Sequence, residues 1–334
     1  MKIAARAAAV TAALMLAMTA AHPQPAGAAA DETPSASTTA PPSTSPPSTP
    51  TSPTPASETH TATPSAAPSA GSPAPSPSGT TEHTIAMGDW DRPYLLHVPP
   101  DRADGEPLPL IVALHGGLND PQYVREQSGL DAVADAQGYA VAYPKGLLGT
   151  WNAGACCWFA RWAGVDDVAF LDRLIDTLVE QGVADRRRVF LTGFSNGGGM
   201  AYRYACERAG RVAGVAVVSG ALAIGCTPER PISVLAFHGT WDPSVPYYGG
   251  GNLDADVKFP FLPVRLLMEF WRWIGGLTAM SWPLPDAPDG CVGTAPGPVR
   301  VALCTIQRGG HKWPSFASGM IASFFDARPS LPAA

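Results

Sequence analysis

The sequence predicts an α/β fold built on a doubly wound, mostly parallel β-sheet. Between residues 83 and 330, segments typical of strands alternate with segments typical of amphipathic helices. The run at 108–114 is continuously apolar, as expected for a strand that is buried on both faces. At 166–179, apolar residues recur with helical spacing, and two aspartates stand at the start, where carboxylates favour the helix dipole.

The opening elements are expected to differ from the rest of the sheet. Residues 83–87 and 94–98 have the composition of short strands joined by a Gly88-Asp89 turn, so they predict an N-terminal antiparallel hairpin. An irregular loop rich in Trp and Cys is expected at 146–164. The remaining elements are expected as strands at 108–114, 139–143, 189–192, 212–218, 232–237 and 299–306, and as helices at 123–136, 166–179, 200–208 and 264–273, with a last helix capped by Ser315.

The first thirty residues have the features of a secretory signal peptide. Lys2 and Arg6 precede a short apolar segment, 7–18, and Ala28-Ala29-Ala30 supplies small residues for cleavage. The apolar segment is too short for a stable transmembrane helix, although a retained signal anchor is the alternative. No later segment is typical of a membrane span, so we expect a secreted protein without stable membrane insertion.

Residues 31–82 predict a disordered linker. The segment consists almost entirely of Pro, Ser, Thr and Ala, and it cannot bury enough apolar surface to offset the entropy of folding. This composition resembles an O-glycosylated stalk, and an unmodified tether is an equal alternative. The linker could associate the protein with the cell wall. Residues 83–330 are then expected to form a single folded domain.

Charge and cysteine content bear on nucleic-acid binding, disulfides and metal sites. The net charge is −6, and removal of the signal with its two basic residues makes it −8, which argues against nucleic acid as a partner. The six cysteines all lie in the predicted domain, and an even number in an exported chain indicates disulfides. The spacing of Cys and His does not match a zinc site, so neither a metal nor a cofactor is expected.

Ser195 is the predicted nucleophile. It lies in Gly193-Phe194-Ser195-Asn196-Gly197, between an apolar strand and a helix-capable segment. This order is the context of a nucleophile elbow, in which small neighbours let strand and helix approach closely. A plain glycine-rich turn is the alternative.

A serine nucleophile needs a base, and two histidines follow Ser195 in the chain. His311 lies in a Gly-rich loop after the last expected strand, which can bend its imidazole back to the sheet edge. His238 lies within an expected strand and is interpreted as structural. We therefore predict His311 as the base.

The acid and the oxyanion donors complete the predicted site. Asp242 follows the strand at 232–237 and would orient His311, with two aspartates at 254 and 256 as fallback candidates. The developing oxyanion needs two preorganised N–H donors. Asn196, next after the nucleophile, should supply one, and Gly117, or else Leu118, the other.

The cysteines allow a partial prediction of pairing. Cys291 and Cys304 flank the approach to the His311 loop, so they are expected to pair. Cys156 and Cys157 are adjacent, and a bond between neighbours has unfavourable geometry. They are therefore expected to reach Cys206 and Cys226 separately, with the connectivity open.

Taken together, these motifs resemble the polyhydroxybutyrate depolymerase and feruloyl esterase group of secreted esterases, which have the α/β-hydrolase fold. The resemblance implies a carboxylic-ester hydrolase that works through an acyl-enzyme on a polyester oligomer or a plant-wall phenolic ester. Residues 276–297, and the bulky Trp158, Phe159 and Trp162, depart from the family pattern. The matching stretches are Leu114-His115-Gly116-Gly117, Gly193-Phe194-Ser195-Asn196-Gly197-Gly198, Phe237-His238-Gly239-Thr240-Trp241-Asp242 and Gly309-Gly310-His311-Lys312-Trp313-Pro314.

Aromatic residues in the loops are expected to bind substrate. Flat aromatic walls suit a phenolic ring, a sugar or a polyester chain. Trp151, Trp162, Trp241, Tyr247 and Trp313 are the chosen candidates. Two other functions remain open, an acyltransferase on the same triad and a non-catalytic cell-wall or adhesion protein.

Overall fold

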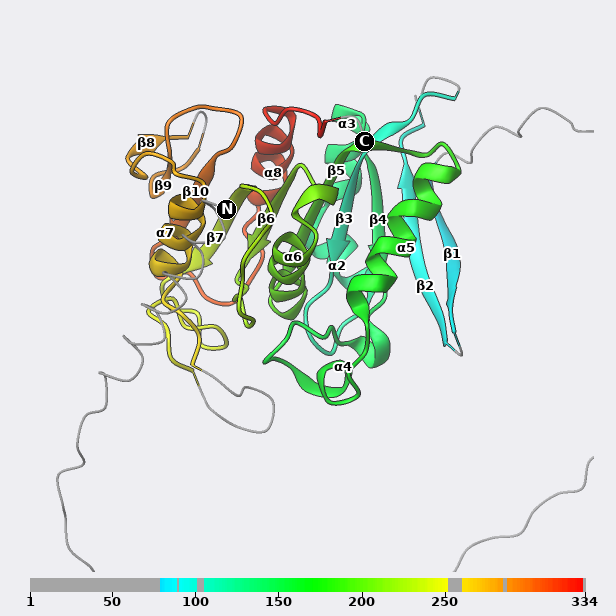
Figure 1. Ribbon diagram of the computed structural model, residues 1–334, viewed down its shortest axis with the longest axis horizontal. Coiled ribbons are helices and arrows are strands. Elements are labelled where there is room, and N and C mark those ends of the chain that lie inside the picture. Colours follow the sequence, from blue (N-terminus) through cyan, green and yellow to red (C-terminus); the bar gives the residue numbers. More distant parts are fainter. Residues whose placement is uncertain (1–78, 89, 101–104, 252–259, 285–286, 333–334) are drawn as a thin grey trace, which may run out of the picture. The chain divides into compact units, whose positions relative to one another are not determined.

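A computed structural model describes residues 79–88, 90–100, 105–251, 260–284 and 287–332 (Figure 1). The predicted signal peptide, and the linker up to residue 78, lie outside the described residues. The strands are β1 (Gly79–Met87), β2 (Trp90–Val98), β3 (Leu108–Leu114), β4 (Ala140–Pro144), β5 (Ala184–Phe194), β6 (Gly214–Val218), β7 (Ser233–Gly239), β8 (Trp282–Pro283), β9 (Cys291–Gly293) and β10 (Val301–Ile306). The helices are α2 (Pro121–Ser128), α3 (Leu130–Gln137), α4 (Trp158–Trp162), α5 (Asp167–Glu180), α6 (Asn196–Glu207), α7 (Val264–Ile274) and α8 (Ala317–Asp326), with 3-10 turns η1 (Leu147–Gly149) and η2 (Ala209–Arg211).

One mixed sheet organises the described residues. Its ten strands run in the order β1-β2-β4-β3-β5-β6-β7-β10-β9-β8. The six central strands, from β4 to β10 in that order, pair in parallel. Antiparallel pairs flank them, β1 and β2 at one end and β9 and β8 at the other. The predicted fold class, a mostly parallel sheet with an N-terminal antiparallel hairpin, is confirmed.

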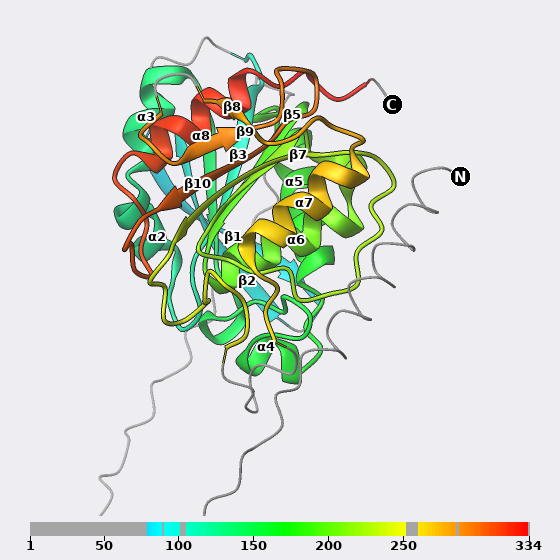
Figure 2. The ribbon, with the colours of Figure 1, turned by 90° about the vertical axis from the view of Figure 1, so that its left-hand side faces the viewer.

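Helices cover both faces of this sheet, and each face has its own apolar core. Helices α5, α6 and α7 pack on one face, where Leu110, Val112 and Leu114 of β3 point. Helices α2, α3 and α8 pack on the other, against Ile111 and Ala113 of the same strand. The alternation along β3 follows from the two-residue period of a strand. Figure 2 shows these two sets of helices on opposite sides of the sheet.

The start of the folded region is earlier than predicted. The linker boundary at 82 is wrong, because β1 begins at Gly79 and Gly79 pairs with Val98 of β2. Thr80 adds a side-chain hydrogen bond between its Oγ1 and Nδ1 of His97, at 3.0 Å. Strand pairing therefore orders residues whose polar composition alone predicts a linker.

Three local features also differ from the expectation. The helix expected at 123–136 is two helices, because Gly129 adopts a left-handed conformation (φ 60°) and caps α2 with an N–H bond to the Arg125 carbonyl. Helix α4 forms within the loop expected to be irregular. Strands β8 and β9 occupy the segment 276–297, for which no element was expected.

The disulfides correct one pairing prediction. Cys291 and Cys304 pair across β9 and β10, as predicted. Cys206 pairs with Cys226, their Cα atoms 5.6 Å apart, so the prediction that each reaches one of the adjacent cysteines is wrong. Cys156 and Cys157 instead bond to each other. Sequence separation did not reveal that the end of α6 lies beside the loop that carries Cys226.

Among the described residues, none of the helices has both the length and the apolar character needed to cross a bilayer.

Candidate active site

Ser195 occupies a tight turn between β5 and α6. Its backbone has φ 54° and ψ −118°, a strained conformation for a residue with a side chain. The turn requires glycine on both sides. A Cβ at Gly193 would meet the Gly197 carbonyl, and a Cβ at Gly197 would meet the backbone carbonyls of Leu114 and His115. The glycines thus let β5, α6 and the end of β3 approach closely enough to present Ser195 at the sheet edge.

His311 and Asp242 come together from two loops that follow β10 and β7. The Nδ1 atom of His311 lies 2.8 Å from Oδ2 of Asp242. The other carboxylate oxygen, Oδ1, accepts N–H bonds from Ser244 at 2.9 Å and Val245 at 2.8 Å. Burial raises the pKa of Asp242, but the His311 and Val245 hydrogen bonds outweigh burial and hold the pKa below its ordinary value. Asp242 is therefore a buried, ionised acceptor that fixes the orientation of the His311 ring.

His238 lies beneath the loop that carries Asp242. Its Nε2 atom donates to the Val245 carbonyl at 2.7 Å, and the side chain is buried. Burial lowers its pKa, which favours the neutral ring. This placement agrees with the interpretation of His238 as a structural residue. The fallback acids at 254 and 256 lie outside the described residues.

The loop after β3 is fixed by His115. This fully buried ring donates from Nδ1 to the Gly116 carbonyl at 2.7 Å and accepts at Nε2 from the Gly146 N–H at 2.9 Å. Burial lowers the pKa of His115 to about 4, so the ring is neutral at pH 7. The loop places Gly117 in the cavity wall, whereas the Leu118 side chain is 69% exposed.

Asn196 ties the Ser195 turn to the loop after β4. Its Oδ1 accepts from the Trp151 N–H at 2.8 Å, and its Nδ2 donates to the Trp151 carbonyl at 3.0 Å. As the first residue of α6, Asn196 has a backbone N–H with no acceptor inside the helix. The sequence predicted only the backbone N–H of Asn196 as a functional group, and it gave no sign that the side chain would bond Trp151.

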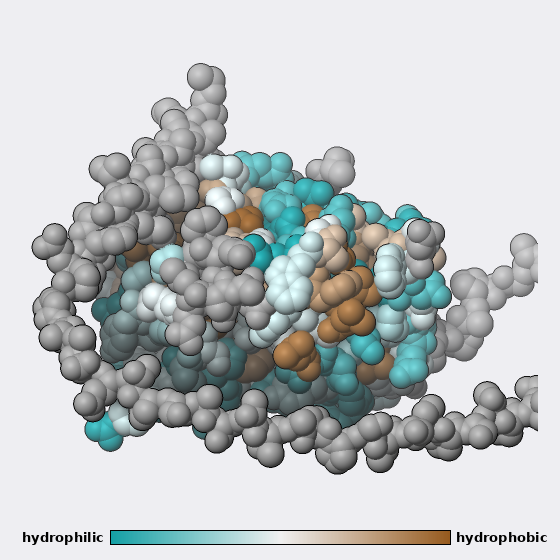
Figure 3. Space-filling model, turned by 90° about the horizontal axis from the view of Figure 1, so that it is seen from below, coloured by the Kyte–Doolittle hydropathy of each residue, from teal (hydrophilic) through white to brown (hydrophobic). Residues whose placement is uncertain are grey.

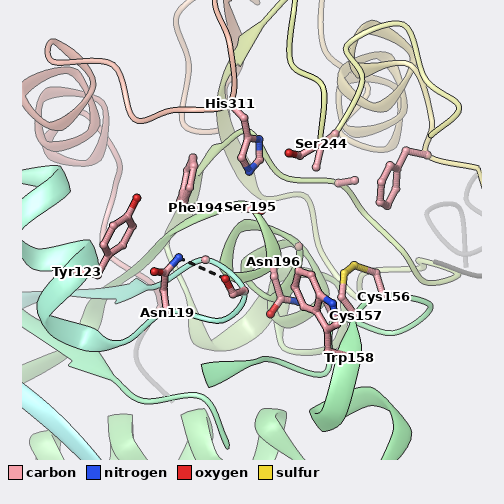
Figure 4. Close-up of a pocket in the computed structure, with 17 residues that line it drawn as sticks. Asn119, Tyr123, Cys156, Cys157, Trp158, Phe194, Ser195, Asn196, Ser244 and His311 are labelled. Carbon is pink, nitrogen blue, oxygen red and sulfur yellow. Dashed lines mark hydrogen bonds between the residues drawn. A yellow bond between two sulfur atoms is a disulfide. The ribbon is translucent and has the colours of Figure 1, made fainter. Parts of the chain in front are cut away.

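Gly117, Ser195, Asn196 and His311 line one cavity of about 540 Å³. In Figure 4, His311 lies above Ser195, while Tyr123 and Asn119 lie to one side and Cys156, Cys157 and Trp158 to the other. Of the described residues that line it, none is Lys, Arg, Asp or Glu. They are Gly116, Gly117, Asn119, Tyr123, Ala153, Cys156, Cys157, Trp158, Phe194, Ser195, Asn196, Gly199, Ala221, Ser244, Val245, Phe261 and His311.

The cavity walls differ from the predicted aromatic set. Trp151, Tyr247 and Trp313 are wrong as substrate walls, because all three are buried in the packed structure. Trp151 donates from Nε1 to the His115 carbonyl, and Trp313 from Nε1 to Oγ of Ser318, both at 3.0 Å. Trp162 and Trp241 are exposed but do not line the cavity.

The aromatic residues that do line the cavity are Tyr123, Trp158, Phe194 and Phe261. The ring of Trp158 lies so close to Gly117 that a Cβ on this glycine would collide with it. Figure 3 views the molecule from the side on which α4 lies in Figure 1, and shows apolar side chains gathered near the middle of this face.

Comparisons with known proteins place the chain among esterases. A family model described as esterase PHB depolymerase matches residues 92–236, which include the Ser195 turn. NocK of Nocardia uniformis subsp. tsuyamanensis, which is named as an esterase, is 31% identical over 256 residues that cover 70% of this chain and 74% of NocK. Feruloyl esterase B of Piromyces equi is 30% identical over 66% of this chain and 42% of its own length.

A further sequence relative and one solved structure extend the comparison. Feruloyl esterase C of Emericella nidulans is 37% identical over 48% of this chain and 59% of its own length. The chain thus spans less than two thirds of either feruloyl esterase. An acetyl xylan esterase structure from Aspergillus awamori has a TM-score of 0.54 at 16% identity, over 74% of this chain and 99% of its own, which supports the α/β-hydrolase fold. On the strength of the NocK alignment and the matching family model, the chain belongs to the esterase PHB depolymerase family of carboxylic ester hydrolases.

Proposed function

We propose that the protein hydrolyses carboxylic esters through an acyl-enzyme on Ser195. The observation that carries the proposal is that His311, held by a 2.8 Å hydrogen bond to Asp242, lines the same cavity as the strained Ser195 turn. His311 is the base and Asp242 the group that orients it. The N–H groups of Asn196 and Gly117 are the oxyanion donors, because both residues line the cavity.

The reaction proceeds in two halves. Ser195 Oγ attacks the ester carbonyl carbon while His311 Nε2 takes the hydroxyl proton. His311 then gives that proton to the leaving alcohol oxygen, the carbon–oxygen bond to the alcohol breaks, and the acyl group stays on Ser195. In the second half a water attacks the acyl carbon, His311 takes and returns a proton, and the free acid leaves. The ionised Asp242 stabilises the imidazolium that forms in each half.

The substrate class follows from the cavity walls. A carboxylate on the acyl group would find no Lys or Arg among the described lining residues, so an uncharged acyl group is preferred. Polyhydroxybutyrate oligomers and feruloyl-type esters both meet this condition. The family description favours the first, and the feruloyl esterase relatives favour the second. Parallel assays on polyhydroxybutyrate oligomers, methyl ferulate and acetylated xylan distinguish these classes.

The protein is proposed to act outside the cell. The N-terminal thirty residues have the composition of a secretory signal, and three disulfides among the described residues suit an oxidising compartment. N-terminal sequencing of the protein from culture medium should find a start near Asp31. An uncleaved protein that stays with the cells would contradict export.

Active-site labelling tests the proposed nucleophile. The wild-type protein should react with a fluorophosphonate probe and hydrolyse p-nitrophenyl butyrate. Ser195→Ala should lose labelling and lower kcat by at least about a thousandfold. Ser323→Ala, which changes an exposed serine on α8, is the matched control and should keep both. Labelling that survives in Ser195→Ala would refute the assignment.

Product analysis separates hydrolysis from acyl transfer. The proposal expects free acid as the main product even when a sugar or lipid alcohol is present. A transferred ester as the main product would make the protein an acyltransferase that uses the same residues.

A further inference from the structure

A third apolar cluster lies outside both cores of the sheet. Its buried members are Cys156, Cys157, Val245 and Phe261, each 6–9% exposed. All four line the cavity that holds Ser195. They come from two connections: the cysteines lie in the loop after β4, and Val245 and Phe261 lie between β7 and α7. An apolar cluster that packs around a cavity rather than inside a core is suited to receive an apolar group.

Backbone pairing fixes the position of the two cysteines. Gly154 forms a parallel bridge with Ala223, and the Ala155 N–H donates to the Ala223 carbonyl at 2.8 Å. The Cys156 carbonyl accepts from the Ala153 N–H at 3.1 Å. The loop with the vicinal disulfide is therefore held against the segment that follows β6.

The cavity has two sides of different chemistry. One side, formed by Asn119, Tyr123 and Phe194, carries an amide and a phenol. Phe194 packs on His311 with ring centroids 4.8 Å apart, so this side adjoins the base. The disulfide and its apolar neighbours form the other side, across Ser195 from Tyr123 in Figure 4.

The position of His311, the proposed base, indicates which side of the cavity receives the alcohol part of the ester and which receives the acyl part. The leaving oxygen must lie within hydrogen-bond reach of His311 to receive its proton. The alcohol part of the ester then extends along the side next to His311, and the acyl part extends toward the other side. The disulfide side has neither charge nor a strong hydrogen-bond donor among its four cluster residues, which suits a short apolar acyl chain.

We propose that the Cys156–Cys157 disulfide, with Val245 and Phe261, forms the acyl-binding wall and sets the acyl length that the enzyme accepts. The inference rests on the proposed ester hydrolysis at Ser195 and adds specificity-determining residues to it. Truncating this wall enlarges the acyl side, so longer acyl chains become better substrates relative to short ones.

A chain-length series tests the wall. The kcat/KM values for p-nitrophenyl acetate, butyrate, hexanoate and octanoate are compared between wild type and the Cys156→Ala/Cys157→Ala variant. The octanoate-to-butyrate ratio should rise at least about tenfold, the size of effect that a methylene or two produces in an apolar pocket. The matched control is Cys206→Ala/Cys226→Ala, which also removes one disulfide but changes residues that do not line the cavity. Its ratio should stay within about twofold of wild type.

Two further experiments test the wall: a single substitution that keeps the disulfide, and a second ester series that varies the alcohol. Val245→Ala keeps all cysteines and should raise the same ratio, so the test holds even if the cysteine variant folds poorly. A series of butyrate esters with different alcohols should keep its order of preference in both wall variants. A change in alcohol preference with unchanged acyl preference would overturn the assignment of this side to the acyl group.

Fluorophosphonate labelling makes the two possible failures distinguishable. If every variant is labelled but the acyl ratio does not change, the wall is refuted and the proposed function stands. If the wild-type protein is not labelled, the proposed function fails, and the acyl-wall proposal that depends on it fails as well.

Discussion

Replacing His115 should change how the stability of the protein depends on pH. The ring is fully buried beneath the Gly117 loop, and burial lowers its pKa from an ordinary value of 6.5 to about 4. The unfolded chain therefore binds a proton near pH 6.5, whereas the folded protein does not bind one until about pH 4. The neutral ring contributes stability that is fully present above pH 6.5 and is lost as the pH falls toward 4.

The size of this effect follows from the two pKa values. Each tenfold change in proton affinity is worth about 1.4 kcal/mol, so the fall from 6.5 to about 4 corresponds to roughly 3 kcal/mol. His115→Asn removes the titrating ring and keeps a side-chain donor near the Gly116 carbonyl, but it loses the acceptor for the Gly146 N–H. The variant should be less stable at pH 7, and its remaining stability should depend less on pH.

Urea unfolding measures the prediction directly. The free energy of unfolding is determined for both proteins at pH 7, 6, 5 and 4, and the difference between them is plotted against pH. Titration of the other groups largely cancels in this difference. The advantage of the wild type should shrink by roughly 3 kcal/mol between pH 7 and pH 4. A difference that stays constant across this range would refute the account of His115 as a buried neutral ring.

Three other substitutions, one of them with a control variant, test parts of the fold and the site. Asp242→Asn should lower kcat for p-nitrophenyl butyrate by about ten-thousandfold, because it favours the wrong imidazole tautomer; a near-normal kcat would exclude Asp242 as the orienting acid. Asp167→Ala leaves Arg92, its buried partner at 2.8 Å, without a counter-charge. Calorimetry should therefore show a stability loss of about 3–5 kcal/mol, and a loss under 1 kcal/mol would contradict this. Gly197→Ala should lower Tm sharply because its Cβ meets backbone carbonyls, while Gly225→Ala, with open space around the added Cβ, should leave Tm unchanged.

Short local patterns carried most of what could be predicted. The Ser195 turn depends on small residues at fixed offsets, and the continuous apolar run of β3 depends on burial of both faces, so each is visible in a few consecutive residues. The order of strands and helices then places Ser195 and the loops of Asp242 and His311 at one sheet edge. This is why the sequence could name three residues that lie together in the structure.

The errors concern properties that depend on tertiary packing. Trp151 was expected in the cavity wall, yet its ring is buried beside Phe170 of α5, with ring centroids 6.5 Å apart. A loop sequence does not reveal which of its aromatic rings turn inward. The same holds for Cys206 and Cys226, since their pairing depends on where the end of α6 lies. The short strand β8 has only two residues, too few for any alternation of apolar and polar side chains.

The two borders of the sheet differ in their exposure to intermolecular strand addition. At one border, β8 is only two residues long and contains Pro283, which lacks the N–H that a neighbouring strand would need. At the other border, β1 offers nine residues. The sequence before β1 has prolines at 73, 75 and 77, each without the N–H that a strand ladder uses. Of the two edge strands in the described residues, β1 therefore favours contact between copies more than β8 does. Polar residues of β1 such as Thr81, Glu82 and Thr84 reduce the risk of aggregation there.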